Sequence, residues 1–135
     1  QEGKKLFDHG NVDAAFDGVG KEVEAIYETP FLSHAPMEPP VSVASVVDGF
    51  CEVWAPVQDP QSCRDLVAGY LGYPVDQVRI NVTMLGGAFG RKSKPDFVLE
   101  AVELSKRRKV PVRVQWSRED DIKHDYYADL PSSFT

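Results

Sequence analysis

This sequence lacks several features that would point directly to a class of protein. Its 135 residues contain only two cysteines, Cys51 and Cys63, and their spacing fits no metal-binding motif. We expect both to be buried free thiols, although the sequence does not settle whether they pair. No apolar run approaches the roughly 18 residues of a membrane-spanning helix. The sequence therefore predicts neither a cysteine-ligated metal site nor a membrane span.

The chain also lacks an excess of positive charge. It has 15 Lys and Arg residues against 21 Asp and Glu residues, a net charge of −6, which argues against a general nucleic-acid binder. One basic run, residues 106–109, is typical either of a nucleic-acid or membrane patch or of the cations favoured at a helix C-terminus. We favour the helix interpretation because the run is short and the chain is acidic.

The first residues show no signal peptide, and a chain whose signal had been removed would begin in the same way, so export stays open. Both ends are abrupt, and we expect the chain to be part of a longer polypeptide. By length it is about one domain. We assign residues 1–20 to an N-terminal segment, 21–127 to a single α+β domain and 128–135 to a tail.

Hydrophobic periodicity predicts an α+β fold: one mixed sheet with helices packed on one face. The predicted order is helix, strand, strand, strand, helix, strand, helix, strand. Asp48-Gly49 predicts a tight hairpin turn, Asn11, Asp59 and Ser93 are the candidate helix N-caps, and a short helix is expected after Ser117. The predicted strands are residues 21–28, 41–47, 50–55, 77–84 and 110–116, and the predicted helices are residues 11–20, 59–71 and 95–107.

The expected core faces follow the same periodicity. They comprise Cys63, Leu66, Val67, Tyr70 and Leu71 on the second helix; Phe97, Val98, Ala101 and Leu104 on the third; and Val78, Ile80, Val82 and Met84 on the strand between them.

A glycine-rich loop, residues 85–92, joins that strand to the third helix. Its three glycines free the backbone to approach another molecule closely, and a loop after a strand and before a helix is a frequent ligand site. Arg91 and Lys92 add positive charge, which favours an anionic ligand that is flat or bulky. A tight turn without a ligand is an equally good interpretation of the spacing. The Walker and dinucleotide-binding patterns both fail here, which counts against a phosphate-handling enzyme.

A proline-rich stretch, residues 30–40, excludes a helix and predicts a stiff extended connection. His34 and Glu38 lie within it. We favour local hydrogen bonding that pins an irregular loop over a catalytic role for these two residues.

Four segments, residues 31–39, 52–58, 86–92 and 111–120, together resemble the molybdenum-binding subunit of the xanthine dehydrogenase/aldehyde oxidase family, nearest to its isoquinoline 1-oxidoreductase β-subunit branch. The resemblance implies a molybdenum–molybdopterin cofactor, in bacteria often the cytosine dinucleotide form. It also implies oxidation of an aldehyde or N-heteroaromatic substrate with oxygen from water. The implied partners are the remaining domains of the large subunit and a small subunit with [2Fe-2S] clusters. A periplasmic location is favoured by resemblance, with the cytoplasm as the alternative.

The same resemblance assigns cofactor-binding residues but no metal ligand and no catalytic residue, because the family's general-base Glu matches no position here. Two departures stand out: Ala88 replaces a glycine and requires a negative φ, and Ser93 stands where many relatives have an acidic residue. We therefore expect the isolated chain to be inactive. The alternative is a non-catalytic binding module that keeps the fold without the cofactor. The implied cofactor-binding residues are Gln58, Gly86, Gly87, Ala88, Phe89, Gly90 and Arg91.

Overall fold

The computed structural model describes residues 4–18, 20–126 and 133–134. Their contacts form two compact units, one within Gln1–Pro30 and Leu130–Thr135 and the other within Phe31–Asp129. The first unit contains α1 (Val12–Phe16) and the two-residue strands β1 (Tyr27–Glu28) and β6 (Ser133–Phe134), which pair antiparallel. The side chain of Asn11 accepts a hydrogen bond from the Ala14 N–H at 2.9 Å, which confirms the predicted cap.

The strand predicted over residues 21–28 is wrong for most of its length, because only Tyr27–Glu28 is a strand. Every described residue of the range 4–30 is exposed. An alternating pattern forms a stable strand only where one of its faces can be buried, and residues 21–26 have no such surface.

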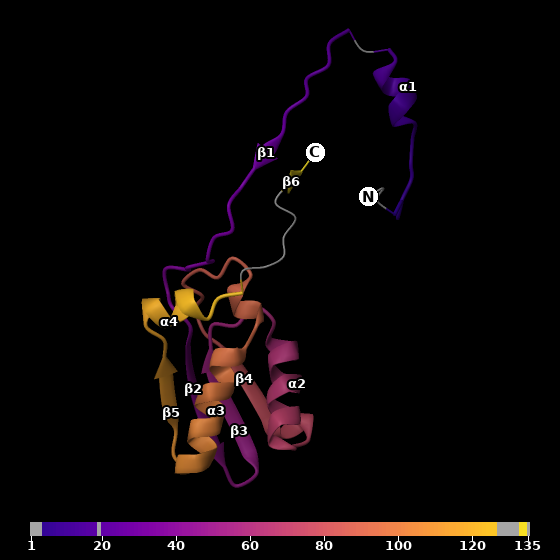
Figure 1. Cartoon of the computed structure of the whole chain (residues 1–135). Coiled ribbons are helices and arrows are strands. Elements are labelled where there is room, and N and C mark those ends of the chain that lie inside the picture. The colour runs from indigo at the N-terminus through magenta and orange to yellow at the C-terminus, as the bar shows by residue number, and fades with distance from the viewer. Residues whose placement is uncertain (1–3, 19, 127–132, 135) are drawn as a thin grey trace. The chain divides into compact units, whose positions relative to one another are not determined.

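The second unit is built on a four-stranded mixed sheet (Figure 1). Its strands lie in the order β4-β3-β2-β5: β4 pairs parallel with β3, and β2 pairs antiparallel with both β3 and β5. Asp48 and Gly49 both have positive φ, 50° and 79°, as the predicted hairpin turn requires. The strands are β2 (Val41–Val47), β3 (Phe50–Ala55), β4 (Val78–Val82) and β5 (Val112–Gln115).

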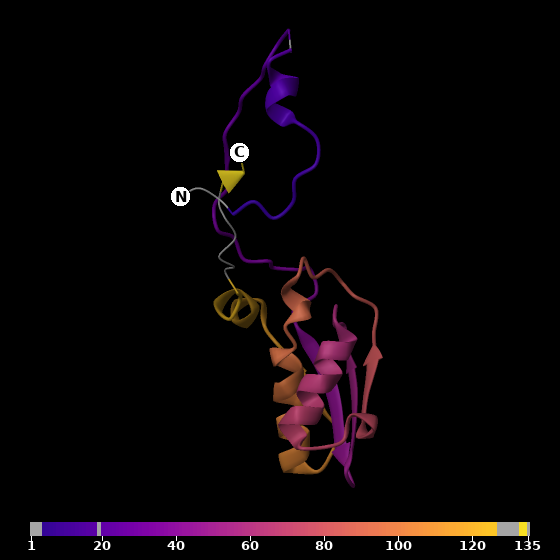
Figure 2. The ribbon, with the colours of Figure 1, turned by 90° about the vertical axis from the view of Figure 1, so that its right-hand side faces the viewer.

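Two helices cover one face of this sheet, as Figure 2 shows edge-on. The first, α2 (Pro60–Leu71), connects β3 to β4, and the second, α3 (Asp96–Arg108), connects β4 to β5 across the sheet. The short helix α4 (Arg118–Lys123) follows β5 and begins with a capping box on Ser117. The predicted α+β class and element order are confirmed. No helix in the described residues is long and apolar enough to span a membrane.

The core lies between the sheet and these two helices. It contains both cysteines as buried free thiols, and burial raises their pKa values to about 11 for Cys51 and about 12 for Cys63. The buried core residues are Ala44, Val46, Cys51, Val53, Ala55, Val57, Cys63, Val67, Ala68, Val78, Phe97, Val98, Ala101, Val102 and Trp116.

Five positions expected in the core lie outside it. Leu66, Tyr70 and Leu104 are exposed because the sheet covers a narrower stripe of each helix than their spacing suggests. Val82 is exposed as the last residue of β4, and Met84 is exposed because it lies beyond the end of that strand.

The predicted cap at Asp59 is confirmed, since its carboxylate accepts from the Ser62 N–H at 3.0 Å. The predicted cap at Ser93 is wrong: α3 starts after Pro95, and the Ser93 hydroxyl donates to the Gly90 carbonyl at 2.6 Å. Ser93 closes the short 3₁₀ turn Arg91–Ser93 instead of starting the helix.

Candidate functional site

The glycine-rich loop leaves the carboxyl end of β4 beside the carboxyl end of its parallel neighbour β3. The Thr83 N–H donates to the Ala55 carbonyl at 3.2 Å, and the Gln58 N–H donates to the Lys92 carbonyl at 3.1 Å. These two bonds hold the chain after β3 against both ends of the loop. Gln58, which is exposed, therefore lies beside the loop, at the end of the sheet where ligands of parallel α/β units bind.

The loop backbone places left-handed residues at three positions. Gly87 has φ 91° and Gly90 has φ 99°, values that suit glycine. Ala88 is not among the positive-φ residues, so its Cβ is accommodated, but Phe89 has φ 55°. This conformation is rare for a bulky side chain, and such strain is concentrated at functional sites.

The loop presents a row of free hydrogen-bond donors. Within the described part of the chain, the N–H groups of Gly87, Ala88, Phe89 and Gly90 donate to no acceptor, whereas the Gly86 N–H donates to Glu38. Successive free N–H groups in a loop with left-handed residues form an anion-binding concavity. Phe89 is 76% exposed. The loop therefore offers both polar donors and an apolar surface to a ligand.

The positive charge expected at the end of the loop lies inside the fold. Arg91 is 1% exposed and Lys92 is 0% exposed. The Arg91 guanidinium binds the Asp96 carboxylate through two bonds of 2.9 Å and packs over the Trp116 ring, 5.2 Å from its centroid. Burial alone would lower the pKa of Arg91, but the bonds and charge of Asp96 outweigh it and raise that pKa. The cations thus fix the loop instead of supplying a charged surface.

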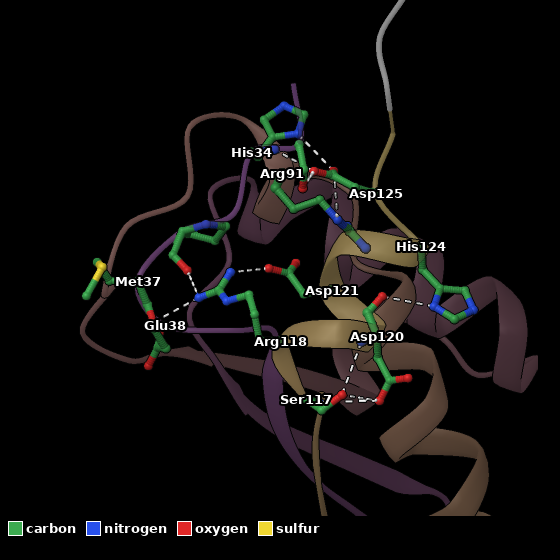
Figure 3. Close-up of polar contacts among 12 residues, drawn as sticks. His34, Met37, Glu38, Arg91, Ser117, Arg118, Asp120, Asp121, His124 and Asp125 are labelled. Atoms are coloured by element: carbon green, nitrogen blue, oxygen red, sulfur yellow. Dashed lines mark hydrogen bonds and ion pairs between the residues drawn. The ribbon is translucent and has the colours of Figure 1, made fainter. Parts of the chain in front are cut away.

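A buried carboxylate joins the proline-rich stretch to the loop (Figure 3). The side chain of Asp125 is 0% exposed; it accepts from the Ser33 hydroxyl and the His34 N–H, and lies 2.8 Å from His34 Nδ1 and 3.5 Å from Arg91 Nε. Burial raises the pKa of Asp125, but the bonds from Ser33 and His34 outweigh burial and lower it. His34 is hydrogen-bonded as expected, but the bonding is not local, because its partner Asp125 lies 91 residues away in the sequence.

Arg118 holds α4 to the same stretch, and a second buried carboxylate, Asp121, pairs with it from within α4. Arg118 donates to Asp121 through Nη1 and to the Pro36 and Met37 carbonyls through Nη2 (Figure 3). Burial raises the pKa of Asp121 despite the neighbouring Arg118. The sequence did not indicate a site role for Asp121 or Asp125, because neither lies in a recognisable pattern. The Ser33 and His34 partners of Asp125 are 92 and 91 residues away in the sequence.

The described residues contain no group of three or more His, Cys, Asp and Glu side chains that could hold a metal ion. A cavity of about 460 Å³ lies along β4, and its lining residues, among them Arg64 and Arg79, do not include the loop. The loop, with Gln58 beside it, is thus the candidate site because of its donors and strain; Phe89 and Gly90 are exposed there, whereas Ala88 is buried.

The chain matches a known protein family over most of its length. The family model described as "Molybdopterin cofactor-binding domain" matches residues 1–128. The chain is 32% identical over 117 residues to the isoquinoline 1-oxidoreductase subunit beta of Brevundimonas diminuta, and 35% identical over 111 residues to the aldehyde oxidoreductase molybdenum-binding subunit PaoC of Escherichia coli strain K12. These alignments cover 85% and 81% of this chain but only 15% of each relative.

Solved structures show the same relationship. Quinoline 2-oxidoreductase from Pseudomonas putida 86 superposes with a TM-score of 0.63 at 25% identity, over 82% of this chain and 14% of that one. A Cu,Mo-CO dehydrogenase superposes with a TM-score of 0.58 at 27% identity, over 81% of this chain and 14% of that one. The chain therefore spans about one seventh of the length of each of these four proteins.

Proposed function

Because this chain belongs to the molybdopterin cofactor-binding domain family, we propose that it forms part of a molybdenum-binding subunit in which the glycine-rich loop and Gln58 face the cofactor. One observation carries the proposal: four consecutive N–H groups, from Gly87 to Gly90, have no acceptor in the described chain and lie in the loop that Gln58 adjoins. Such donors match the oxygen atoms of a phosphate or of a metal centre.

The residues present fit that cofactor. The described residues contain no group of three or more His, Cys, Asp and Glu side chains that could hold a metal, and in this proposal the pterin carries the metal. When bound, the cofactor supplies the redox chemistry by which an aldehyde or N-heteroaromatic is oxidised with water as the oxygen source.

Each cofactor-binding residue has a separate task in this proposal. The Gln58 amide donates a hydrogen bond without adding charge, and Ala88 with the loop glycines supplies backbone donors and close approach. The exposed Phe89 ring covers an apolar part of the cofactor. Arg91 acts from inside, by fixing the end of the loop through Asp96.

We extend the proposal to the complete enzyme. The remaining domains of the large subunit would close around the cofactor, which we propose carries the cytosine dinucleotide form, and a small subunit with [2Fe-2S] clusters would take the electrons. The family's general base has no counterpart in these 135 residues, so the isolated chain should be inactive. The relatives' names favour aldehydes or N-heteroaromatics as substrates.

The test is Gln58→Ala in the assembled enzyme. Loss of a residue that adjoins a metal site typically lowers activity about 10- to 100-fold, so we expect at least about a tenfold loss of turnover with the fold intact. Gln61→Ala is the matched control, since that exposed side chain bonds only Asp65 on α2. Steady-state turnover per molybdenum is the measurement, and equal turnover of the two variants would remove Gln58 from the site.

The molybdenum content of the natively isolated protein decides between this proposal and a non-catalytic binding module. Near-stoichiometric molybdenum is the expected result. Absence of molybdenum would favour the module, whose glycine-rich loop would then be only a turn.

A further inference from the structure

Glu38 binds both ends of the glycine-rich loop with one carboxylate oxygen. Its Oε2 accepts from the Gly86 N–H at 3.2 Å and from Lys92 Nζ at 2.6 Å. Gly86 and Lys92 are six positions apart, and all four free N–H groups lie between them. A single side chain from the proline-rich stretch thus closes the loop at its base.

The backbones of Glu38 and Gly86 also pair directly. The Glu38 N–H donates to the Gly86 carbonyl at 3.0 Å, so this residue bonds Gly86 through its main chain and its side chain. A Cβ on Gly86 would lie 2.6 Å from the Glu38 Cβ, closer than real Cβ contacts come. Glycine at position 86 is therefore required by this contact with Glu38, since its φ is not in the left-handed region.

Replacing the Glu38 carboxylate would leave the buried Lys92 ammonium without its counter-charge. Its side chain is 0% exposed, and Glu38 is the carboxylate that pairs with it. A buried ammonium without a counter-charge is strongly unfavourable. The end of the loop would have to move outward to hydrate Lys92 if that counter-charge were lost.

We propose that Glu38 is a positioning residue that holds the glycine-rich loop in the shape that receives the cofactor; this inference rests on the proposed function. Glu38 itself does not contact the cofactor. It acts through Gly86 and Lys92 on the four donors between them, and it keeps Phe89 in its left-handed conformation. The same contact gives Glu38 of the proline-rich stretch a role that its sequence position did not reveal.

The first measurement is the rate of tryptic cleavage after Arg91 in the full chain. Arg91 is 1% exposed, so cleavage there requires the loop to open. We expect Glu38→Gln, which keeps the shape and removes the charge, to raise this rate about tenfold, and Glu38→Asp, which keeps the charge on a shorter side chain, to raise it less. Glu103→Gln is the matched control, because it makes the same change at an exposed pair with Arg107.

Cleavage after Arg64, in α2, separates a local effect from general destabilisation. We expect that rate to stay constant in Glu38→Gln. If Glu38→Gln raised the cleavage rate after Arg64 as much as the rate after Arg91, the positioning role would be overturned. It would also be overturned if Glu38→Gln were cleaved after Arg91 no faster than Glu103→Gln. If Glu38→Gln does not fold, Glu38→Asp takes its place in the same measurement. Cleavage of Glu38→Asp after Arg91 at the rate of the unmodified protein would then overturn the proposal.

The second measurement is the molybdopterin retained per assembled enzyme after purification. We expect a severalfold loss in Glu38→Gln and none in Glu103→Gln. Faster loop cleavage with full retention would overturn the link between Glu38 and the cofactor. In that case Gln58→Ala separates the two proposals: a loss of turnover there leaves the proposed function standing, and unchanged turnover removes it as well.

Discussion

Phe89 combines an exposed aromatic ring with a left-handed backbone. Its φ is 55° and the residue is 76% exposed. Left-handed backbone costs a non-glycine residue about 1–2 kcal/mol, and no packing in the described chain compensates for an exposed ring. A strained and exposed phenylalanine contributes little to folding, and in the proposed function its ring faces the cofactor.

Replacing Phe89 with glycine tests this explanation. Relief of the backbone strain is partly offset by the entropy of an unfolded glycine, about 0.5–1 kcal/mol. We expect Phe89→Gly to leave the free energy of unfolding unchanged or to raise it by up to about 1 kcal/mol, measured by urea denaturation, while cofactor retention falls.

Lys109→Gly is the control for Phe89→Gly. Lys109 has φ 56° at the end of α3, is exposed and lies outside the site. It should gain similar stability without loss of cofactor. A marked loss of stability in Phe89→Gly alone would show that the ring packs within the protein.

At the scale of elements, one buried hydroxyl adds a hydrogen bond to the contact of α3 with β2. Ser105 is 0% exposed, accepts from the Val46 N–H at 2.9 Å and donates to the Val110 carbonyl at 2.8 Å. Periodicity placed Leu104 on this face, but the neighbouring serine occupies it because two backbone groups need a partner there.

Ser105→Ala should lower the free energy of unfolding by about 2 kcal/mol, because it leaves the buried Val46 N–H without a partner and removes the bond to the Val110 carbonyl. Ser42→Ala is the control. Ser42 is 1% exposed and its hydroxyl has no hydrogen-bond partner in the described chain, so its removal should be neutral or stabilising. Equal losses in the two variants, measured by urea denaturation, would contradict the role of the Ser105 bonds.

At the scale of the molecule, Asp125 joins parts of the second unit that are far apart in sequence. It links residues 33 and 34 with Arg91 and with the chain after α4. Because its pKa is lowered, its contribution to stability is complete above the ordinary aspartate pKa of about 3.9 and is lost as the pH falls through the folded value.

Asp125→Asn should therefore lower stability by about 2 kcal/mol at pH 7, the range for hydrogen bonds to charged groups. The difference from the unmodified protein should shrink below about pH 4. Urea denaturation from pH 2 to pH 7 measures this difference, with the exposed Asp65→Asn as control. A difference that does not change with pH would mean that the charge of Asp125 is not what matters.

Local sequence determined most of the fold, since its signals act over a few residues. Asp48-Gly49 specified the hairpin turn, Asp59 the start of α2, and the glycines the loop after β4. Each rests on backbone conformation or on a hydrogen bond within three residues. Residues 21–26 show where local signals fail. Their apolar and polar residues alternate as in a strand, but no strand forms because they have no surface to be buried against.

Tertiary structure alone decided how the site is held. The sequence placed Arg91 and Lys92 at the end of the loop, and it could not reveal that Asp96, Asp125 and Glu38 neutralise them. Charge in a sequence predicts a binding surface only if it stays exposed, and burial is set by residues up to 54 positions away. The positions of the loop and Gln58 followed from the sequence; the closing of the loop by Glu38 followed only from the fold.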